Sequence, residues 1–176
     1  PAVEFHGLIF AYMGPPGDTP PFPYYDVFQM PDTHFVPYSI WHSCNWLHVH
    51  ENIIDAAHIV FLHSRAAGLQ LQPDMAVMPV TEFRETDDGH GCLYAVSRRV
   101  RDFIWVRCIH TLLPNLFQPP ALMGEIDAER LYTRIAMSRW TVPIDDTHCM
   151  IFGIRHFRDD VTDPEYRDRS KVGEEK

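Results

Sequence analysis

The sequence predicts an α+β domain in which a helix packs on a curved antiparallel sheet. Residues 46–62 repeat apolar side chains at helical spacing, without a proline or glycine. Five later segments are rich in β-branched, aromatic and apolar residues, and turn signals separate several of them. A helix followed by successive antiparallel strands is typical of this fold class.

The elements before the helix follow from local patterns. Residues 7–15, GLIFAYMGP, predict a strand that ends in a turn. Seven prolines between Pro15 and Pro37 then exclude a helix or a central strand and indicate an extended surface connection. A short strand is expected from about Val36 to Ser43.

The helix and the later strands complete the prediction. Ile53, Ala57 and Val60 mark the apolar face of the helix, and Gly68 sets its latest end. The tail after Arg158 is polar, so helix, loop and disorder all remain open there. The predicted strands are residues 75–86, 92–99, 103–113, 131–142 and 149–157.

Composition excludes several classes of protein. The chain has 176 residues, 45% of them hydrophobic, which suits one domain or a large piece of one. A net charge of −9 argues against nucleic-acid binding, and no apolar run is long enough to span a membrane. Cys44, Cys92, Cys108 and Cys149 form no CxxC pair, so we expect reduced, buried thiols in a cytoplasmic protein.

Asp55, His58 and His63 carry the most informative chemistry. Asp55 and His58 are three residues apart and share a helix face. His58 and His63 are five apart, about 140° around an ideal helix, so a regular helix does not bring both imidazoles to one metal ion. A π-type turn, or a break just before His63, would correct the angle.

Two neutral histidines suit a first-row divalent metal, and with one carboxylate they form the triad of non-heme iron oxygenases. The spacing alone does not settle this interpretation, because the chain contains 11 histidines. A metal-free ligand-binding module of helix-grip type and a zinc hydrolase that uses the same histidines remain open.

The surrounding residues carry a resemblance to a known family. Asn45-Trp46 followed by Glu51-Asn52-x-x-Asp55-x-x-His58-x4-His63 resembles the signature of catalytic α subunits of Rieske-type ring-hydroxylating oxygenases, in their phthalate-dioxygenase-like branch. Residues 7–23 resemble that family's passage out of its Rieske domain, and residues 139–157 resemble a late strand pair of its catalytic domain. The resemblance therefore covers most of the chain.

The resemblance implies roles for four residues. His58 and His63 match the two histidine ligands of the iron, and Asp55 matches the carboxylate that couples a neighbouring subunit's Rieske centre to that iron. Asn52 is expected to line the oxygen or substrate pocket, with an ordinary polar contact equally open. The alternative for Asp55 is a solvated helix carboxylate.

The family also implies a fold, an activity and partners. We expect a helix-grip fold (START/Bet v 1-like), incomplete at the C-terminus, with residues 1–37 leaving a missing Rieske domain and residues 38–176 forming the catalytic domain. The expected activity is dioxygen activation at Fe(II), which hydroxylates or oxidatively dealkylates an aromatic substrate, such as an aromatic acid. Electrons would come from a reductase or ferredoxin through the missing [2Fe-2S] cluster. A trimer is the expected assembly, without nucleic-acid or membrane partners.

Two departures from the family pattern stand out. The Cys-x-His and Cys-x-x-His pairs of a Rieske cluster are absent, since His42-Ser43-Cys44 and His148-Cys149 run in the wrong order. The third iron ligand, an Asp in the family, is expected beyond Lys176. The in-chain candidates are Asp159, Asp160 and Asp163, although acidic residues in a charged tail are usually solvated.

Other residues have simpler interpretations. His48 and His50 lack an HExxH context, so a zinc protease is not indicated, and we expect His110 and His156 to be core or pocket residues. Glu51 is interpreted as structural and Trp46 as core. Arg98, Arg107 and Arg139 are all candidates to pair with a substrate carboxylate, and the sequence selects none of them. Large apolar residues of the strands are expected to be mostly sheet core, with some lining a pocket: Phe83, Tyr94, Trp105, Met137, Trp140 and Phe152.

Overall fold

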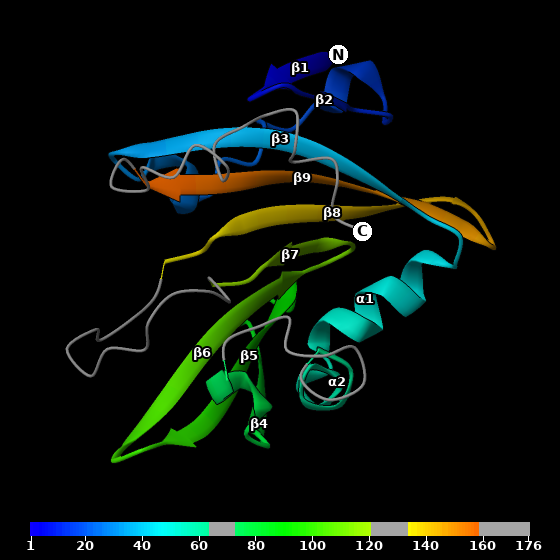
Figure 1. Cartoon of the computed structure of the whole chain (residues 1–176). Helices are drawn as coiled ribbons and strands as arrows, with labels where there is room; N and C mark the ends of the chain where they lie inside the picture. Colours follow the sequence, from blue (N-terminus) through cyan, green and yellow to red (C-terminus); the bar gives the residue numbers. More distant parts are fainter. Residues whose placement is uncertain (64–72, 121–133, 159–176) are drawn as a thin grey trace.

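A computed structural model of the chain describes residues 1–63, 73–120 and 134–158. A sheet of seven antiparallel strands forms its centre, in the spatial order β3-β9-β8-β7-β6-β5-β4, and a separate hairpin of two strands lies beside it (Figure 1). The predicted α+β class is confirmed. The strands are β1 (Ala2–Phe5), β2 (Leu8–Ala11), β3 (Thr33–His42), β4 (Val80–Glu85), β5 (Gly91–Val100), β6 (Phe103–Leu112), β7 (Leu116–Gln118), β8 (Met137–Asp145) and β9 (His148–Arg158).

The predicted single helix is wrong in one respect. It is divided into α1 (Trp46–Ile54) and α2 (Ala56–Phe61), and Asp55 stands between them in an extended conformation. No proline or glycine causes this break. The Asp55 carboxylate accepts a hydrogen bond from the backbone N–H of Ala57, and this N-cap starts a new helix where the apolar pattern suggested continuity.

Three strands match their predicted bounds closely, and others do not. β5, β6 and β9 begin and end within about two residues of the expected positions. β4 begins later than expected because a short 3-10 helix, η4 (Pro73–Ala76), occupies the start of that segment. The hairpin strand β1 and the three-residue strand β7 were not predicted.

The sheet has two faces with different cover. On the inner face, Ala56 of α2 packs with Tyr94, Val96, Ile109 and Phe117 from β5, β6 and β7. Further along this face, a second cluster comprises Val36, Tyr38 and Ile151, against which Val49 of α1 packs. Both helices therefore lie on the same side of the sheet (Figure 1).

The N-terminal residues cover part of the outer face. Two short 3-10 helices, η1 (Pro16–Asp18) and η2 (Asp26–Gln29), lie within the proline-rich stretch. Phe5 and Phe28 pack on Ile154 of β9, and the ring of Phe10 lies 5.1 Å from that of Trp140 in β8. Residues before β3 thus form a second layer.

Pro37 lies inside β3, which pairs with β9 alone. Because proline cannot donate to a neighbouring strand, an edge strand is where the sheet tolerates it. The prediction that the proline-rich stretch holds no central strand is confirmed.

The cysteines differ from expectation in part. Cys149 is buried and Cys44 and Cys92 are half-buried, but Cys108 is exposed on β6, so the expectation of four buried thiols is wrong for Cys108. In the parts of the chain that the structure describes, no helix is long and apolar enough to cross a membrane.

Candidate metal centre

Asn45 fixes the start of α1. Its side-chain oxygen accepts a hydrogen bond of 2.9 Å from the N–H of Leu47, and its amide nitrogen donates to the backbone oxygen of Asp146 at 3.0 Å. The first contact caps the helix, and the second ties it to the turn between β8 and β9. Asn45 and Trp46, the first two residues of the family signature, are thus the N-cap and the first residue of α1.

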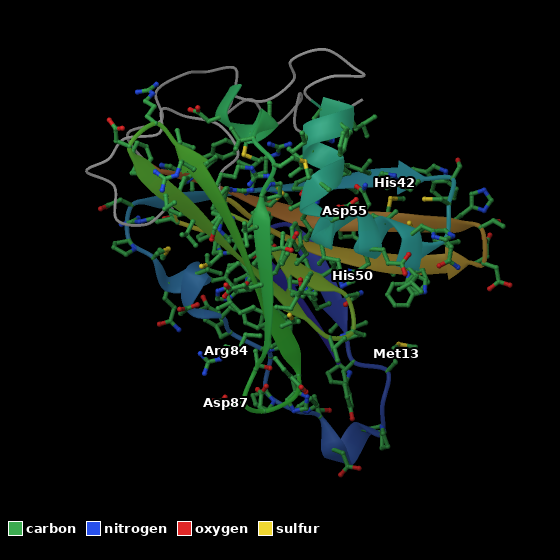
Figure 2. The ribbon with its side chains drawn as sticks, turned by 90° about the horizontal axis from the view of Figure 1, so that it is seen from below. Met13, His42, His50, Asp55, Arg84 and Asp87 are labelled. Carbon is green, nitrogen blue, oxygen red and sulfur yellow. The ribbon has the colours of Figure 1, made fainter. Side chains whose placement is uncertain are left out.

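The break at Asp55, which is labelled in Figure 2, is stabilised by two hydrogen bonds. The N–H of Ala57 donates to the Asp55 carboxylate at 2.8 Å, and the N–H of Ala56 donates to the hydroxyl oxygen of Tyr94 at 2.9 Å. Both N–H groups belong to the first turn of α2, where no intrahelical partner exists. The break therefore leaves neither of these groups unsatisfied.

The same break orients His58. The Nδ1 atom of its ring hydrogen-bonds the backbone oxygen of Asp55. A carbonyl oxygen can only accept, so Nδ1 carries the proton and Nε2 keeps its lone pair, which is the arrangement that a metal-binding histidine requires. Burial lowers the pKa of His58, with the hydrogen bond to Asp55 opposing this shift and His63 adding to it. The neutral ring is the form that binds a metal.

His63 follows a deviation in the backbone, as the angular argument required. After Phe61, residues 62 and 63 continue as a π-type turn instead of a regular α-helix. The ring centroids of His58 and His63 lie 5.3 Å apart, with the ring planes at 71°. The structure therefore brings together the two imidazoles that a regular helix would separate.

Asn52 and Asp55 occupy different positions relative to this pair. Asn52 lies on α1, before the break, and its side chain is exposed. Asp55 is also exposed, although its carboxylate caps α2 and its backbone oxygen holds His58. The Asp55 carboxylate therefore lies three residues before the candidate ligand His58 and at the protein surface.

The described residues supply two candidate ligands and no complete set. Within residues 1–63, 73–120 and 134–158, no group of three or more His, Cys, Asp or Glu side chains gathers as a metal site. The in-chain candidates for a third ligand, Asp159, Asp160 and Asp163, lie outside these residues.

The remaining histidines have separate surroundings. His48 is exposed and lies 3.6 Å from Glu51, while His50 is buried, with its ring 6.3 Å from that of Trp46. His110 is exposed on the outer face of β6, so a core position is wrong for this residue.

His156 is half-buried and contacts Phe28, Phe35 and Ser138. Its strand neighbour Ile154 packs in the outer cluster, so His156 lies on the face away from the helices. The prediction of a core position is confirmed for this residue.

The aromatic candidates divide between the two faces. Tyr94 is buried on the inner face, and Phe83 stacks on it with centroids 4.5 Å apart but remains 58% exposed. Trp140 packs in the outer cluster, away from α2. Phe152 is paired with Trp140 and is 38% exposed, so Phe83 and Phe152 are not sheet core, the position expected for most of these residues.

The sequence named Tyr94 only among the residues expected to form sheet core or to line a pocket, and not as a hydrogen-bond partner of the helix that carries His58. Its hydroxyl oxygen accepts a hydrogen bond from the N–H of Ala56, the first residue of α2, and Ala56 lies two residues before His58. A tyrosine in a strand is ordinary core by pattern, and only the three-dimensional contact distinguishes it. No local signal pointed to this role.

Comparison with protein families gives one match over most of the chain. Residues 42–175 match the family described as the vanillate O-demethylase oxygenase C-terminal domain. This range includes both helices and most of the large sheet.

Three curated proteins are similar in sequence, among them the oxygenase subunit of 3-chlorobenzoate-3,4-dioxygenase from Comamonas testosteroni, which is 29% identical over 88% of this chain, a span of 35% of that protein. The oxygenase subunit of tert-butanol monooxygenase / tert-amyl alcohol desaturase from Aquincola tertiaricarbonis is 40% identical over 97% of this chain, which spans 38% of that protein. The alpha subunit of phenoxybenzoate dioxygenase from Ectopseudomonas oleovorans is 30% identical over 84% of this chain, again spanning 38% of that protein. The chain thus spans well under half the length of these relatives.

Among solved structures, dicamba monooxygenase bound to 3,6 dichlorosalicylic acid has a similar fold. The TM-score is 0.67 at 18% sequence identity, with 97% of this chain and 54% of that one covered. At this level of identity the likeness concerns the fold.

Proposed function

Since the chain belongs to the vanillate O-demethylase oxygenase C-terminal domain family and is a catalytic fragment of a Rieske-type oxygenase, we propose that it holds the mononuclear iron of such an enzyme. His58 and His63 are the proposed protein ligands. The observation that carries the proposal is the pairing of the two rings at 5.3 Å, with Nδ1 of His58 bonded to the Asp55 backbone.

The chain's own groups fit an iron centre. The protonated Nδ1 of His58 directs the Nε2 lone pair away from Asp55, and burial lowers the pKa of the ring, which favours its neutral form. Two histidines leave positions for a carboxylate and for exogenous ligands, which non-heme Fe(II) sites require. Iron bound there would supply dioxygen activation for the hydroxylation or oxidative dealkylation of a substrate. The third ligand is proposed to be an Asp outside the described residues.

Asp55 is proposed to link this site to the electron donor of a neighbouring subunit. Its carboxylate is exposed at the protein surface, and its backbone oxygen is hydrogen-bonded to the ring of the proposed ligand His58. Asp55 therefore connects the surface directly to that ring. We propose that a [2Fe-2S] cluster fed by a reductase or ferredoxin is that donor, within a homo-oligomer, taken as a trimer from the family resemblance. Asn52 is proposed as a polar residue of the oxygen or substrate pocket.

The substrate class has two candidates. An aromatic compound, such as an aromatic acid, is the first, and the names of the phenoxybenzoate and 3-chlorobenzoate dioxygenase relatives support it. A small tertiary alcohol is the second, because the relative with 40% identity is named as a tert-butanol monooxygenase. Oxygen consumption coupled to product formation, measured with benzoate and with tert-butanol, separates the two.

Metal analysis tests the iron site. In the intact oxygenase that contains this chain, His58→Ala and His63→Ala should each abolish the spectroscopic signal of high-spin ferrous iron. His48→Ala is the matched control, since His48 lies on α1 and is exposed beside Glu51. An unchanged ferrous signal in both ligand variants contradicts the proposal. Zinc in place of iron would favour a hydrolase, and absence of metal would favour a binding module.

A further inference from the structure

Cys44 and Cys149 lie beside each other where α1 meets the sheet. Cys149 of β9 is paired with His42 of β3, and Cys44 follows His42 by two residues, so the two cysteines are diagonal neighbours on one face of this strand pair. That face is the inner one, because Ile151, two residues beyond Cys149, belongs to the cluster against which Val49 of α1 packs. The pairing of β3 with β9 therefore brings together two thiols that are far apart in the sequence.

The two side chains are in direct contact. Burial raises the pKa of the Cys149 thiol, and Cys44 adds to this shift through a hydrogen bond between the two side chains. Both cysteines are free thiols in the structure. A disulfide forms without large backbone movement only where the two side chains already point toward each other. This pair meets that condition.

The exposure of the two thiols differs and assigns an order of reaction. Cys149 is 0% exposed, whereas Cys44 is half-buried. A thiol must be both accessible and deprotonated to attack an oxidant in solution. The raised pKa keeps Cys149 protonated, and its burial excludes the oxidant. Cys44 is therefore the thiol that reacts first, and Cys149 is the thiol placed to displace the leaving group from it.

Cys44 also directly precedes the start of α1. Asn45 caps the helix, and its side-chain amide donates a hydrogen bond of 3.0 Å to the backbone oxygen of Asp146, in the turn between β8 and β9 (Figure 1). This contact is exposed, and Leu47 and His48 in the first turn of the helix are exposed as well. A covalent bond between Cys44 and β9 would hold the same end of the helix permanently.

We propose that Cys44 and Cys149 form a reversible disulfide that fixes the start of α1 to the sheet under oxidising conditions. The oxidant is a small-molecule disulfide such as oxidised glutathione. The inference goes beyond the proposed function and does not depend on it.

The reaction proceeds by two thiol–disulfide exchanges. The Cys44 thiolate attacks one sulfur of oxidised glutathione and releases one glutathione, which leaves a mixed disulfide on Cys44. Cys149 then loses its proton and attacks the Cys44 sulfur, which releases the second glutathione. Two protein thiols are oxidised to one disulfide, and one glutathione disulfide is reduced to two glutathione molecules, which take up both protons.

Peptide mass spectrometry tests the bond in the intact protein that contains this chain. The protein is equilibrated with a series of mixtures of reduced and oxidised glutathione, its free thiols are alkylated, and it is digested with trypsin. The peptide of residues 140–155, which contains Cys149, should appear linked to the peptide that contains Cys44, and dithiothreitol should release it. Cys44→Ser and Cys149→Ala should each abolish the link. In Cys149→Ala, Cys44 should stop at the mixed disulfide with glutathione.

Cys108 provides the matched control. It is exposed on β6 and paired with Ala95, so it faces away from Cys92, which is three residues from Ala95 on β5. Cys108 should therefore stop at the mixed disulfide, and Cys108→Ser should leave the link between Cys44 and Cys149 unchanged. Absence of this link over the whole series would overturn the proposal, and glutathione on Cys108 in the same sample would show that the oxidant had reacted.

Hydrogen exchange tests the effect of the bond on the helix. The amides of Leu47 and His48 donate to the side chain and the backbone oxygen of Asn45, and both should exchange about tenfold more slowly in the oxidised protein. The amide of Ala56, at the start of α2, should not change. Cys44→Ser, treated with the same mixtures, gives the baseline and replaces a half-buried side chain, so it serves where Cys149→Ala does not fold. Equal exchange at Leu47 and His48 in the oxidised and reduced wild-type protein would overturn the proposal.

Discussion

At the scale of single residues, Asp55 has three structural roles in the candidate metal centre. Its extended backbone ends α1, its carboxylate caps α2 through Ala57, and its carbonyl oxygen holds Nδ1 of His58. The side chain caps the helix, and the main chain orients the ring of His58. These roles can be separated by substitution.

Substitution of Asp55 tests its proposed part in electron delivery. Asp55→Asn keeps a side-chain oxygen that accepts from Ala57, so the free energy of unfolding should change by less than about 0.5 kcal/mol. Because the charge is lost, product formed per dioxygen consumed should fall to near zero in the intact enzyme, with the ferrous signal retained. Asp55→Ala, which also removes the cap, should additionally cost about 1 kcal/mol. Normal coupled turnover in Asp55→Asn would refute the electron-transfer role.

His156 makes the stability of the outer layer depend on pH. Burial lowers the pKa of His156 to about 4, from an ordinary value of 6.5. As the pH falls through this window, the unfolded chain binds the proton before the folded chain does, so stability is complete above pH 6.5 and is lost toward pH 4.

The predicted loss between pH 7.5 and pH 5 is about 2 kcal/mol from this residue. Urea unfolding at both pH values measures it, with His156→Gln as the comparison. Glutamine does not titrate and can still hydrogen-bond Ser138, so the variant should lose about 2 kcal/mol less than the wild type. Equal losses in the two proteins would show that His156 does not cause the pH dependence.

At the scale of elements, the junction between α1 and α2 depends on a residue from the sheet. Tyr94 accepts the hydrogen bond from the buried N–H of Ala56, and Ala56 packs in the same apolar cluster as Tyr94. The start of α2, and with it the position of His58, is therefore set by β5. A local signal in the helix does not specify this contact.

Tyr94→Phe removes the acceptor and leaves the ring in place. The buried N–H of Ala56 then has no partner, so the free energy of unfolding should drop by about 1–3 kcal/mol. Hydrogen exchange at the Ala56 amide should accelerate together with this loss. Tyr38→Phe is the matched control, since the hydroxyl of this buried tyrosine makes only a 3.5 Å contact with the Met137 sulfur. A smaller effect at Tyr94 than at Tyr38 would contradict the role of the junction.

The sequence predicted the backbone deviation before His63 but not the break at Asp55 or the short strand β7, and each outcome has a physical reason. The angle between His58 and His63 required a backbone deviation, and the π-type turn before His63 agrees with it. The break at Asp55 was not predicted, because apolar residues at Ile53, Ala57 and Val60 keep helical spacing across it. Capping by a side chain leaves little trace in such a pattern. Short strands such as β7 likewise carry too few residues to show alternation.

At the scale of the whole molecule, the sheet is covered on its inner face by α1 and α2 and on part of its outer face by the residues before β3. Phe28 is 6% exposed and its ring contacts those of Phe5, Phe35 and His156, which ties the N-terminal segment to β3 and β9. If the chain is divided at residue 37, as expected from the sequence, the two parts are in contact, because Phe28 packs against His156 and Ile154.

Phe28→Ala tests how strongly the outer layer supports the sheet. Loss of this buried ring should lower the free energy of unfolding by about 3–5 kcal/mol in chemical denaturation. Met13→Ala is the control in the same segment, because Met13 is 91% exposed, and its effect should stay within about 0.5 kcal/mol. Similar small effects in both variants would mean that the segment is a detachable connection.

The site as a whole was predictable only in part. The family resemblance singled out His58 and His63, and the structure brings their rings together. Arg98, Arg107 and Arg139 could not be ranked from the sequence, because their burial is a property of the folded sheet. Arg139 illustrates the difference: its guanidinium lies 5.9 Å from the Tyr38 ring and is less buried than those of Arg98 and Arg107.

Every amino acid at position 55 would offer the same carbonyl oxygen to His58, because that oxygen belongs to the main chain. The choice of imidazole tautomer is therefore insensitive to mutation at this position, provided that the extended conformation is kept. The side chain is free to vary in charge without altering which nitrogen of His58 is bonded to the main chain. If the proposed electron-transfer role of Asp55 is correct, substitution at position 55 would change electron delivery and leave the orientation of the His58 ring unchanged.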